Sequence, residues 1–315
     1  ICYATNSANT NIYNVRELAD IGSTTQIDPP DSGALVQIIQ SDAEDIYMAD
    51  GTTPLTGDRT GMSTPPSEND YSIALYIQYG DIEYATAGDA DGEYDTSSFG
   101  YTYNDVETLL ASRYGRVDIM RANHHGSSHS TSQTYVDALD PDASAISCGN
   151  NSFGHPAQAV LDRLLATGDV YVTNTCDTTR NYGASVLVHG DIVIESTNGS
   201  NYTIDGVAYV ASSPLNDVVI NEFLAAPSSG PEWVELYNPT AIPIDISGAY
   251  IDDINGGGSP KQIPANTILD GGDYYVHEMN NLFNNGGDDV RFLLPDGSTV
   301  VDSYTYSSTS SGSVW

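Results

Sequence analysis

Basic residues are scarce in this 315-residue chain. It holds nine lysines and arginines against 43 aspartates and glutamates, for a formal net charge of −34, and Lys261 is its only lysine. Because binding to nucleic acid depends on neutralising phosphates with lysine and arginine, such a surface repels polyanions at ordinary ionic strength. A nucleic-acid partner is therefore expected only at high salt, where screening shortens the repulsion, or with bound divalent cations.

Long apolar runs and cysteines are also few. No stretch approaches the roughly 18 apolar residues of a membrane-spanning helix, so no membrane span is predicted. Three cysteines, Cys2, Cys148 and Cys176, are too few for a disulfide scaffold. A bridge between Cys148 and Cys176 is conceivable, since both lie near predicted strand ends that flank the loop of His155, but an odd count leaves one cysteine over.

The composition also bears on where the protein works. Scarce lysine, 22 tyrosines and many small polar residues favour an extracellular protein over a cytosolic one. The excess of acid indicates either a saline environment or a surface protein whose charge keeps it in solution.

Three of the six histidines lie in two short motifs. His124 and His125 belong to Asn-His-His-Gly-Ser (residues 123–127), and His155 belongs to Phe-Gly-His-Pro (residues 153–156). Imidazole is a common metal ligand and proton shuttle, so this clustering beside glycines indicates a chemical site. Upstream, Asp89 follows a predicted strand, and a carboxylate in that place can bridge two metal ions. The alternatives are loop histidines without partners and an ordinary acidic turn.

Strand and helix signals alternate over the first two thirds of the chain. Residues 72–79 and 82–86 are predicted to form a hairpin around a Tyr-Gly-Asp turn. Further strands are expected at 33–40, 118–120, 143–148, 170–173, 184–189 and 192–196, and helices at 12–21, 104–114, 132–139 and 157–165. Pro156 is expected in the first turn of the last helix. This alternation predicts a layered α/β fold.

The order of these motifs resembles the C-terminal half of a metallo-β-lactamase-fold hydrolase domain of the competence (DNA-uptake) type. The similarity runs from Asn69-x-x-Ser72 through Gly-Asp89 and the His-His-Gly-Ser motif to Gly-His155-Pro and the helix after it. It implies part of an αββα sandwich over residues 1–208, with Asp89 and His125 as ligands of two zinc or manganese ions. His124 and His155 would then contact the scissile phosphate.

One motif of that family, His-x-His-x-Asp-His, occurs nowhere in the sequence. Without it, this chain alone is not expected to assemble an ordinary two-zinc site. Either an N-terminal half precedes Ile1 or the domain is degenerate, and a start in mid-pattern without methionine favours the first. The resemblance predicts a secreted metal-dependent phosphodiesterase or nuclease. The alternative is a non-catalytic surface or filament subunit built on the same scaffold.

Residues 209–216 are expected to be a linker, after which the composition changes. Short strands with turns about every ten residues predict a β-sandwich over residues 217–315. Five motifs in order, from Val-Val-Ile-Asn-Glu (218–222) to Val-Asp-Ser-Tyr (301–304), resemble a lamin tail domain, an immunoglobulin-like sandwich. The resemblance implies an accessory adhesion or targeting module, with self-assembly through its edge strands as an alternative role. Trp233 is expected in its core.

Calcium is a further candidate ion, because two groups of acidic residues carry the oxygen ligands that it prefers. The first group lies in the polar segment 50–69, an expected surface loop, and consists of Asp50, Asp58 and Glu68. The second lies in the sandwich, where a solvated acidic face is the favoured interpretation, and consists of Glu222, Glu235, Asp252 and Asp253.

Overall fold

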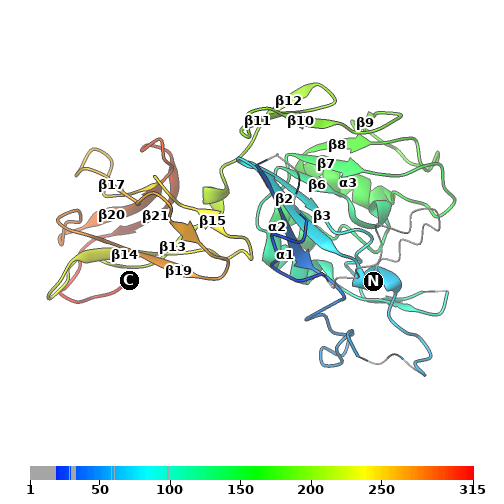
Figure 1. Ribbon diagram of the computed structural model, residues 1–315, viewed down its shortest axis with the longest axis horizontal. Helices are drawn as coiled ribbons and strands as arrows, with labels where there is room; N and C mark the ends of the chain where they lie inside the picture. The colour runs from blue at the N-terminus through cyan, green and yellow to red at the C-terminus, as the bar shows by residue number, and fades with distance from the viewer. Residues whose placement is uncertain (1–18, 28, 30–32, 58, 60, 98) are drawn as a thin grey trace. The chain divides into compact units, whose positions relative to one another are not determined.

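The computed structural model describes residues 19–27, 29, 33–57, 59, 61–97 and 99–315 (Figure 1). The chain divides into two compact units, Ile1–Ala211 and Ser212–Trp315. The first is a mixed α/β unit and the second is all β, which confirms the predicted fold classes. Most of the helix expected at 12–21, together with Cys2 and Asp58, lies outside the described residues.

A seven-stranded sheet in the order β1-β2-β3-β6-β7-β8-β9 forms the centre of the N-terminal unit within the described residues. Strands β1, β2 and β3 pair antiparallel, and β3, β6, β7, β8 and β9 pair parallel. The predicted hairpin of β2 and β3 is confirmed. The strands are β1 (Ala34–Gln40), β2 (Ala74–Tyr79), β3 (Ile82–Thr86), β6 (Ile119–Arg121), β7 (Ala143–Ile146), β8 (Asp169–Val172) and β9 (Val186–Leu187).

Helices connect the parallel strands. They are α1 (Glu107–Tyr114), α2 (Gln133–Leu139) and α3 (Gln158–Thr167), each close to its predicted range. Right-handed crossovers that step in one direction along a sheet place their helices on one face, and α1 packs against α2 and α2 against α3. The Ser132 hydroxyl caps α2 by accepting the N–H of Tyr135. The placement of Pro156 was wrong, because α3 begins at Gln158 after an extended Ala157.

A second sheet covers the other face of the central one. It contains β10 (Ile194–Ser196), β11 (Asn201–Ile204) and β12 (Val207–Val210), so the strand expected at 192–196 starts this sheet and does not extend the main one. Its Tyr202 and Ile204 pack in one apolar cluster with Ile82, Ile119 and Tyr171 of the main sheet.

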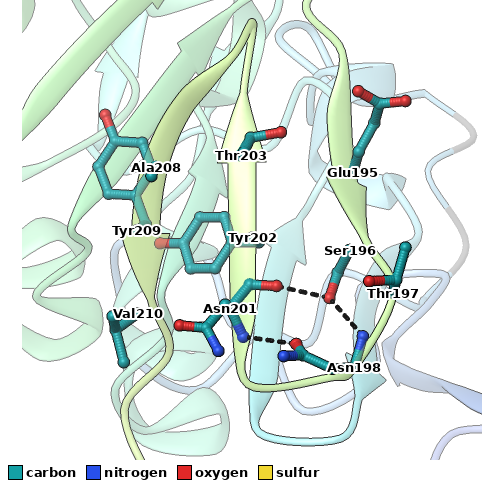
Figure 2. Close-up of a pocket in the computed structure, with 10 residues that line it drawn as sticks. All are labelled: Glu195, Ser196, Thr197, Asn198, Asn201, Tyr202, Thr203, Ala208, Tyr209 and Val210. Carbon is teal, nitrogen blue, oxygen red and sulfur yellow. Dashed lines mark hydrogen bonds between the residues drawn. The ribbon is translucent and has the colours of Figure 1, made fainter.

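A pocket of about 520 Å³ opens on this second sheet (Figure 2). The stacked rings of Tyr202 and Tyr209, with centroids 5.1 Å apart, form part of its lining. The rest is aliphatic, hydroxyl and amide groups with one carboxylate, and no lining residue is a histidine or a cation. The pocket therefore lacks the chemistry that the sequence motifs predict.

Short elements complete the N-terminal unit and lead out of it. They are η1 (Glu68–Tyr71), β4 (Asp95–Thr96), β5 (Thr102–Tyr103), η2 (Asn123–Gly126) and η3 (Pro214–Asp217). The stretch expected as a linker, 209–216, thus holds the end of β12 and the start of η3.

The C-terminal unit is an antiparallel β-sandwich, as predicted. Its sheets are β13-β14-β19, β17-β16-β20-β21 and the pair β15-β18. Their bounds are β13 (Val219–Leu224), β14 (Glu232–Tyr237), β15 (Ile244–Asp245), β16 (Tyr250–Asp252), β17 (Lys261–Gln262), β18 (Ile268–Leu269), β19 (Tyr274–Met279), β20 (Asp288–Leu293) and β21 (Val300–Tyr306). One core joins the sheets, with Phe223, Val234 and Leu236 facing Ile251 and Phe292.

Two expectations for the sandwich were wrong. Trp233 alternates along β14 with the buried Val234, so its side chain is half-exposed and is not part of the core. Asp252 and Asp253 are buried and do not form a solvated face. Asp252 pairs with Arg291, and the carboxylate of Asp253 accepts the N–H of Gly258.

Candidate functional site

The carboxyl ends of the parallel strands bring the predicted site residues to one edge of the main sheet. Asp89 follows β3, His124 and His125 follow β6, and His155 follows β7. Loops at this edge form the usual ligand crevice of α/β proteins. The backbone N–H of His124 donates to the carbonyl of Gly88 at 3.1 Å, which joins the first two loops directly.

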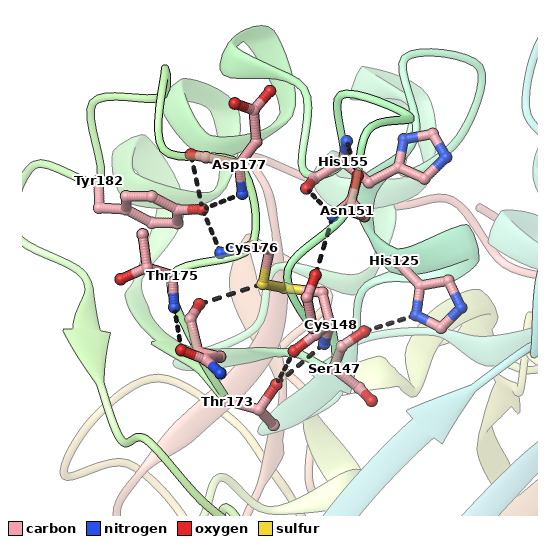
Figure 3. The surroundings of a disulfide bond; sticks show 12 residues. His125, Ser147, Cys148, Asn151, His155, Thr173, Thr175, Cys176, Asp177 and Tyr182 are labelled. Carbon is pink, nitrogen blue, oxygen red and sulfur yellow. Dashed lines mark hydrogen bonds between the residues drawn. A yellow bond between two sulfur atoms is a disulfide. The ribbon is translucent and has the colours of Figure 1, made fainter.

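His125 and Asp89 face each other across this edge. His125 Nε2 lies 3.7 Å from Asp89 Oδ1, and both side chains are about two-fifths exposed. The other ring nitrogen of His125, Nδ1, donates to the carbonyl of Ser147 (Figure 3). A carbonyl only accepts, so in the neutral ring this bond places the proton on Nδ1 and the lone pair on Nε2. A ring held in this way by a carbonyl is typical of metal-binding histidines.

His124 is held by a different carboxylate, that of Asp91. Its Nδ1 donates to Asp91 Oδ1 at 2.8 Å, and the amide nitrogen of Asn69 lies 3.4 Å from the same ring atom. Burial lowers the pKa of His124, but the hydrogen bond and charge of Asp91, with the charge of Asp89, outweigh burial and raise that pKa overall. His124 therefore carries a proton more readily than an ordinary histidine.

The ring of His155 packs beside that of His124, with centroids 5.3 Å apart in an edge-to-face arrangement. Burial, followed by the positive charges of His124 and His125, lowers the pKa of His155 to about 4. Near neutral pH the low pKa keeps His155 uncharged, while the raised pKa of His124 favours its protonated form. Their surroundings therefore move the pKa values of these two histidines, which were predicted to contact phosphate, in opposite directions.

The loop of His155 is fixed by Asn151 and by a disulfide (Figure 3). Asn151 Oδ1 accepts the N–H of His155 at 3.2 Å, and its amide nitrogen donates to the carbonyl of His155 at 2.8 Å. The backbone N–H of Asn151 donates to the carbonyl of Cys176. Cys148 and Cys176 form a disulfide, so the conceivable bridge is confirmed.

Both histidine motifs touch at Gly126 and Pro156. Gly126 has a φ of +76°, and a Cβ there would lie 2.9 Å from the Cβ of Pro156. His124 and His125 also have positive φ values of 47° and 55°, which turn the chain sharply in front of Gly126. The N–H of Ala157 donates to the carbonyl of Gly126 at 2.7 Å, which closes the contact.

Two buried carboxylates support the site and were missed in the sequence. Asp91 is fully buried, and burial raises its pKa against the opposing hydrogen bond of His124. Glu107 of α1 is also fully buried and accepts hydrogen bonds from Asn123 Nδ2 and from the N–H groups of Thr131 and Ser132. Burial raises the pKa of Glu107 to about 7. The spacing of Asp91 in Gly-Asp-Ala-Asp was a usable signal, whereas nothing local marks Glu107.

Arg121 and His129 complete the surroundings. Arg121 donates to the carbonyl of Gly88 at 2.7 Å, and its guanidinium lies 3.8 Å from Asp89 Oδ1. His129 is half-buried and stacks on Tyr103 with centroids 4.3 Å apart. Arg121 therefore supplies a positive charge beside the Asp89–His125 pair.

Asp89 and His125 are two donors, whereas a catalytic zinc site usually has three protein ligands. Within the described ranges, no group of three or more His, Cys, Asp or Glu side chains is arranged to hold a metal ion. The described residues on their own do not fit a two-metal centre, and the described members of the two acidic groups considered for calcium form no such cluster either. The pair fits part of a metal site.

Comparison with known proteins supports both of the resemblances seen in the sequence. Residues 211–308 match the lamin tail domain. ComE operon protein 3 of Bacillus subtilis (strain 168) is 30% identical over 112 residues, which is 35% of this chain. Recombination protein 2 of Haemophilus influenzae is 27% identical over 99 residues, or 31% of this chain. The distant similarity to the first protein agrees with the competence-type resemblance of the motifs.

These similarities are partial. The matched stretches cover 13% of ComE operon protein 3 and 11% of Recombination protein 2.

No helix among the described residues is long and apolar enough to cross a membrane.

Proposed function

We propose that the N-terminal unit is a metal-dependent phosphodiesterase that works outside the cytoplasm. The carrying observation is the convergence of Asp89, His124, His125 and His155 at one sheet edge, with Nε2 of His125 3.7 Å from Asp89 Oδ1. Distant similarity to ComE operon protein 3 supports the same interpretation. The lamin tail domain is proposed as an accessory adhesion or targeting module.

His124 and His155 act on the phosphate group in this proposal. Asp91 fixes the ring of His124 and favours its protonated form, so His124 stabilises negative charge on a phosphate oxygen. His155, neutral and held by Asn151, donates a hydrogen bond to a second oxygen. Asp89 and His125 would hold zinc or manganese, whose remaining donors are not among the described residues.

The charge of the chain and its disulfide set the proposed conditions. The bridge between Cys148 and Cys176 fits an oxidising, extracytoplasmic location. Because the whole chain has a net charge of −34, it binds a nucleic-acid phosphodiester only at high salt or with divalent cations. Both points support an extracellular protein of a saline environment.

A second candidate is a non-catalytic surface or filament subunit in which the hydrolase-like unit is a scaffold. The shortage of metal donors within the described part of the chain favours it. In that case the edge strands of the lamin tail domain mediate contacts between copies.

Hydrolysis of bis(p-nitrophenyl) phosphate with added zinc or manganese in concentrated NaCl tests the first proposal. The double variant Asp89→Ala/His125→Ala is compared with His189→Ala, which removes an exposed histidine outside the site. We expect at least a 100-fold loss in the double variant and full activity in the control. Retained hydrolysis in the double variant overturns the metal assignment. An inactive wild type that forms oligomers supports the scaffold candidate.

A further inference from the structure

Phe153 presents a bare aromatic ring beside the candidate site. Its side chain is 76% exposed, and its ring stacks against that of His155 with centroids 6.1 Å apart and planes 21° apart. His155 in turn packs against His124. An exposed apolar ring thus lies next to the residues that are proposed to contact phosphate.

The loop that carries Phe153 is firmly held, so this exposure is built into the structure. Asn151 Oδ1 accepts the N–H groups of both Phe153 and His155, at 3.1 and 3.2 Å. Arg180 donates to the carbonyl of Gly154 at 2.9 Å from the other side. The ring is therefore presented without the entropy cost of ordering a mobile loop, which is the property of a preorganised binding surface.

We infer that Phe153 is a stacking platform for an unpaired nucleobase next to the phosphate that His124 and His155 contact. Single-stranded nucleic acid is then the preferred ligand, since a paired base offers no free face to the ring. Nine basic residues against 43 acidic ones leave little phosphate neutralisation to hold the strand, so stacking on Phe153 would have to supply a large part of the affinity. Base stacking needs no positive charge and persists at high salt.

The inference rests on the proposed phosphate-binding role of the histidines, and its test separates binding from hydrolysis. Fluorescence anisotropy in concentrated NaCl with a chelator compares labelled oligothymidylate with an abasic strand of the same length and backbone. The variants are Phe153→Ala, Phe153→Trp and Phe99→Ala. Phe99 is the matched control, because it is also 76% exposed but stacks on Tyr101 and not on a site histidine.

The wild type is expected to bind oligothymidylate about tenfold more tightly than the abasic strand. Phe153→Ala abolishes that ratio, while Phe153→Trp and Phe99→Ala keep it, with unchanged melting temperatures throughout. Equal binding of both strands by the wild type, binding of neither, or a ratio that survives Phe153→Ala overturns the inference. If the preference is present but added metal gives no hydrolysis, the platform stands and the phosphodiesterase proposal fails.

Discussion

Asp91 accepts the Nδ1–H of His124 from a position that is entirely closed to solvent. The second oxygen of Asp91 has no hydrogen-bond partner within the described part of the chain. Burying a carboxylate in this setting is energetically costly, so Asp91 is expected to have a role other than packing. We interpret Asp91 as a positioning residue that orients His124 and stabilises its positive charge.

Replacing Asp91 by asparagine should lower phosphodiesterase kcat by about 10- to 100-fold with a smaller change in KM. The amide oxygen still accepts from His124, but the negative charge is gone. Steady-state kinetics and thermal melting are measured together. Asp95→Asn is the control, since Asp95 is largely exposed and lies 3.9 Å from His129. An equal loss in both variants would contradict the positioning role.

Loss of the Cys148–Cys176 bridge should destabilise the chain and disturb both histidines. The bridge joins positions 28 residues apart, for which chain entropy gives about 3 to 4 kcal/mol. Cys148 adjoins Ser147, which holds His125, and Cys176 holds Asn151, which orders His155. Urea unfolding and kcat are measured for Cys148→Ser/Cys176→Ser, with Cys2→Ser as control. Unchanged kcat in a folded double variant would show that the bridge serves stability alone.

Asp70 should make the folded state less stable as pH rises. Burial raises its pKa from 3.8 to about 7, against the hydrogen bonds of Asn104, so the folded state holds a proton that the unfolded chain releases near pH 4. Stability from this group is complete below about pH 4, falls up to about pH 7 and is then constant. The shift corresponds to at most about 4 kcal/mol.

Urea unfolding at pH 5 and pH 8 measures this slope. Asp70→Asn should lose less stability than the wild type over that interval. Asp50→Asn serves as control, because the hydrogen bonds of Thr53 lower the Asp50 pKa to about 2, outside the interval. Identical slopes in the wild type and Asp70→Asn would mean that Asp70 stays ionised when folded.

Added salt should strengthen binding of a single strand. Most proteins lose affinity for nucleic acid with salt because bound cations are released, but here the stronger effect is repulsion from an excess of 34 negative charges, which salt screens. Affinity for oligothymidylate is measured from low to concentrated NaCl. A steady decrease with salt would instead reveal a basic binding surface that the sequence does not suggest.

Local signals predicted most of the fold. The Tyr-Gly-Asp turn marked the β2–β3 hairpin, and Ser132 marked the start of α2. The second sheet could not be recognised as separate, because a strand sequence does not say which neighbour it pairs with. Trp233 was misplaced because a large aromatic residue suits either face of a sheet. The side chains of Trp233 and Val234 point to opposite faces of β14, and only the folded structure shows that the core lies on the side of Val234.

The site was predicted in part. The motifs identified the residues that the structure gathers, Asp89, His124, His125 and His155, whose chemical roles are still proposals. Their supports were missed, because the burial of Glu107 and the capture of His125 by a carbonyl depend on contacts between distant segments. Buried carboxylates such as Glu107 are hard to recognise in a chain with 43 acidic residues, because nothing local distinguishes one carboxylate from the others.

The contact between Gly126 and Pro156 restricts which residues the two histidine motifs can hold at these positions. Any side chain at position 126 would collide with Pro156, and the carbonyl of Gly126 already anchors the start of the segment that leads into α3. A side chain at position 126 therefore requires the backbone at Pro156 to move. Although the two motifs are well separated in sequence, related chains are expected to keep glycine at position 126 wherever a residue with a Cβ stands at position 156.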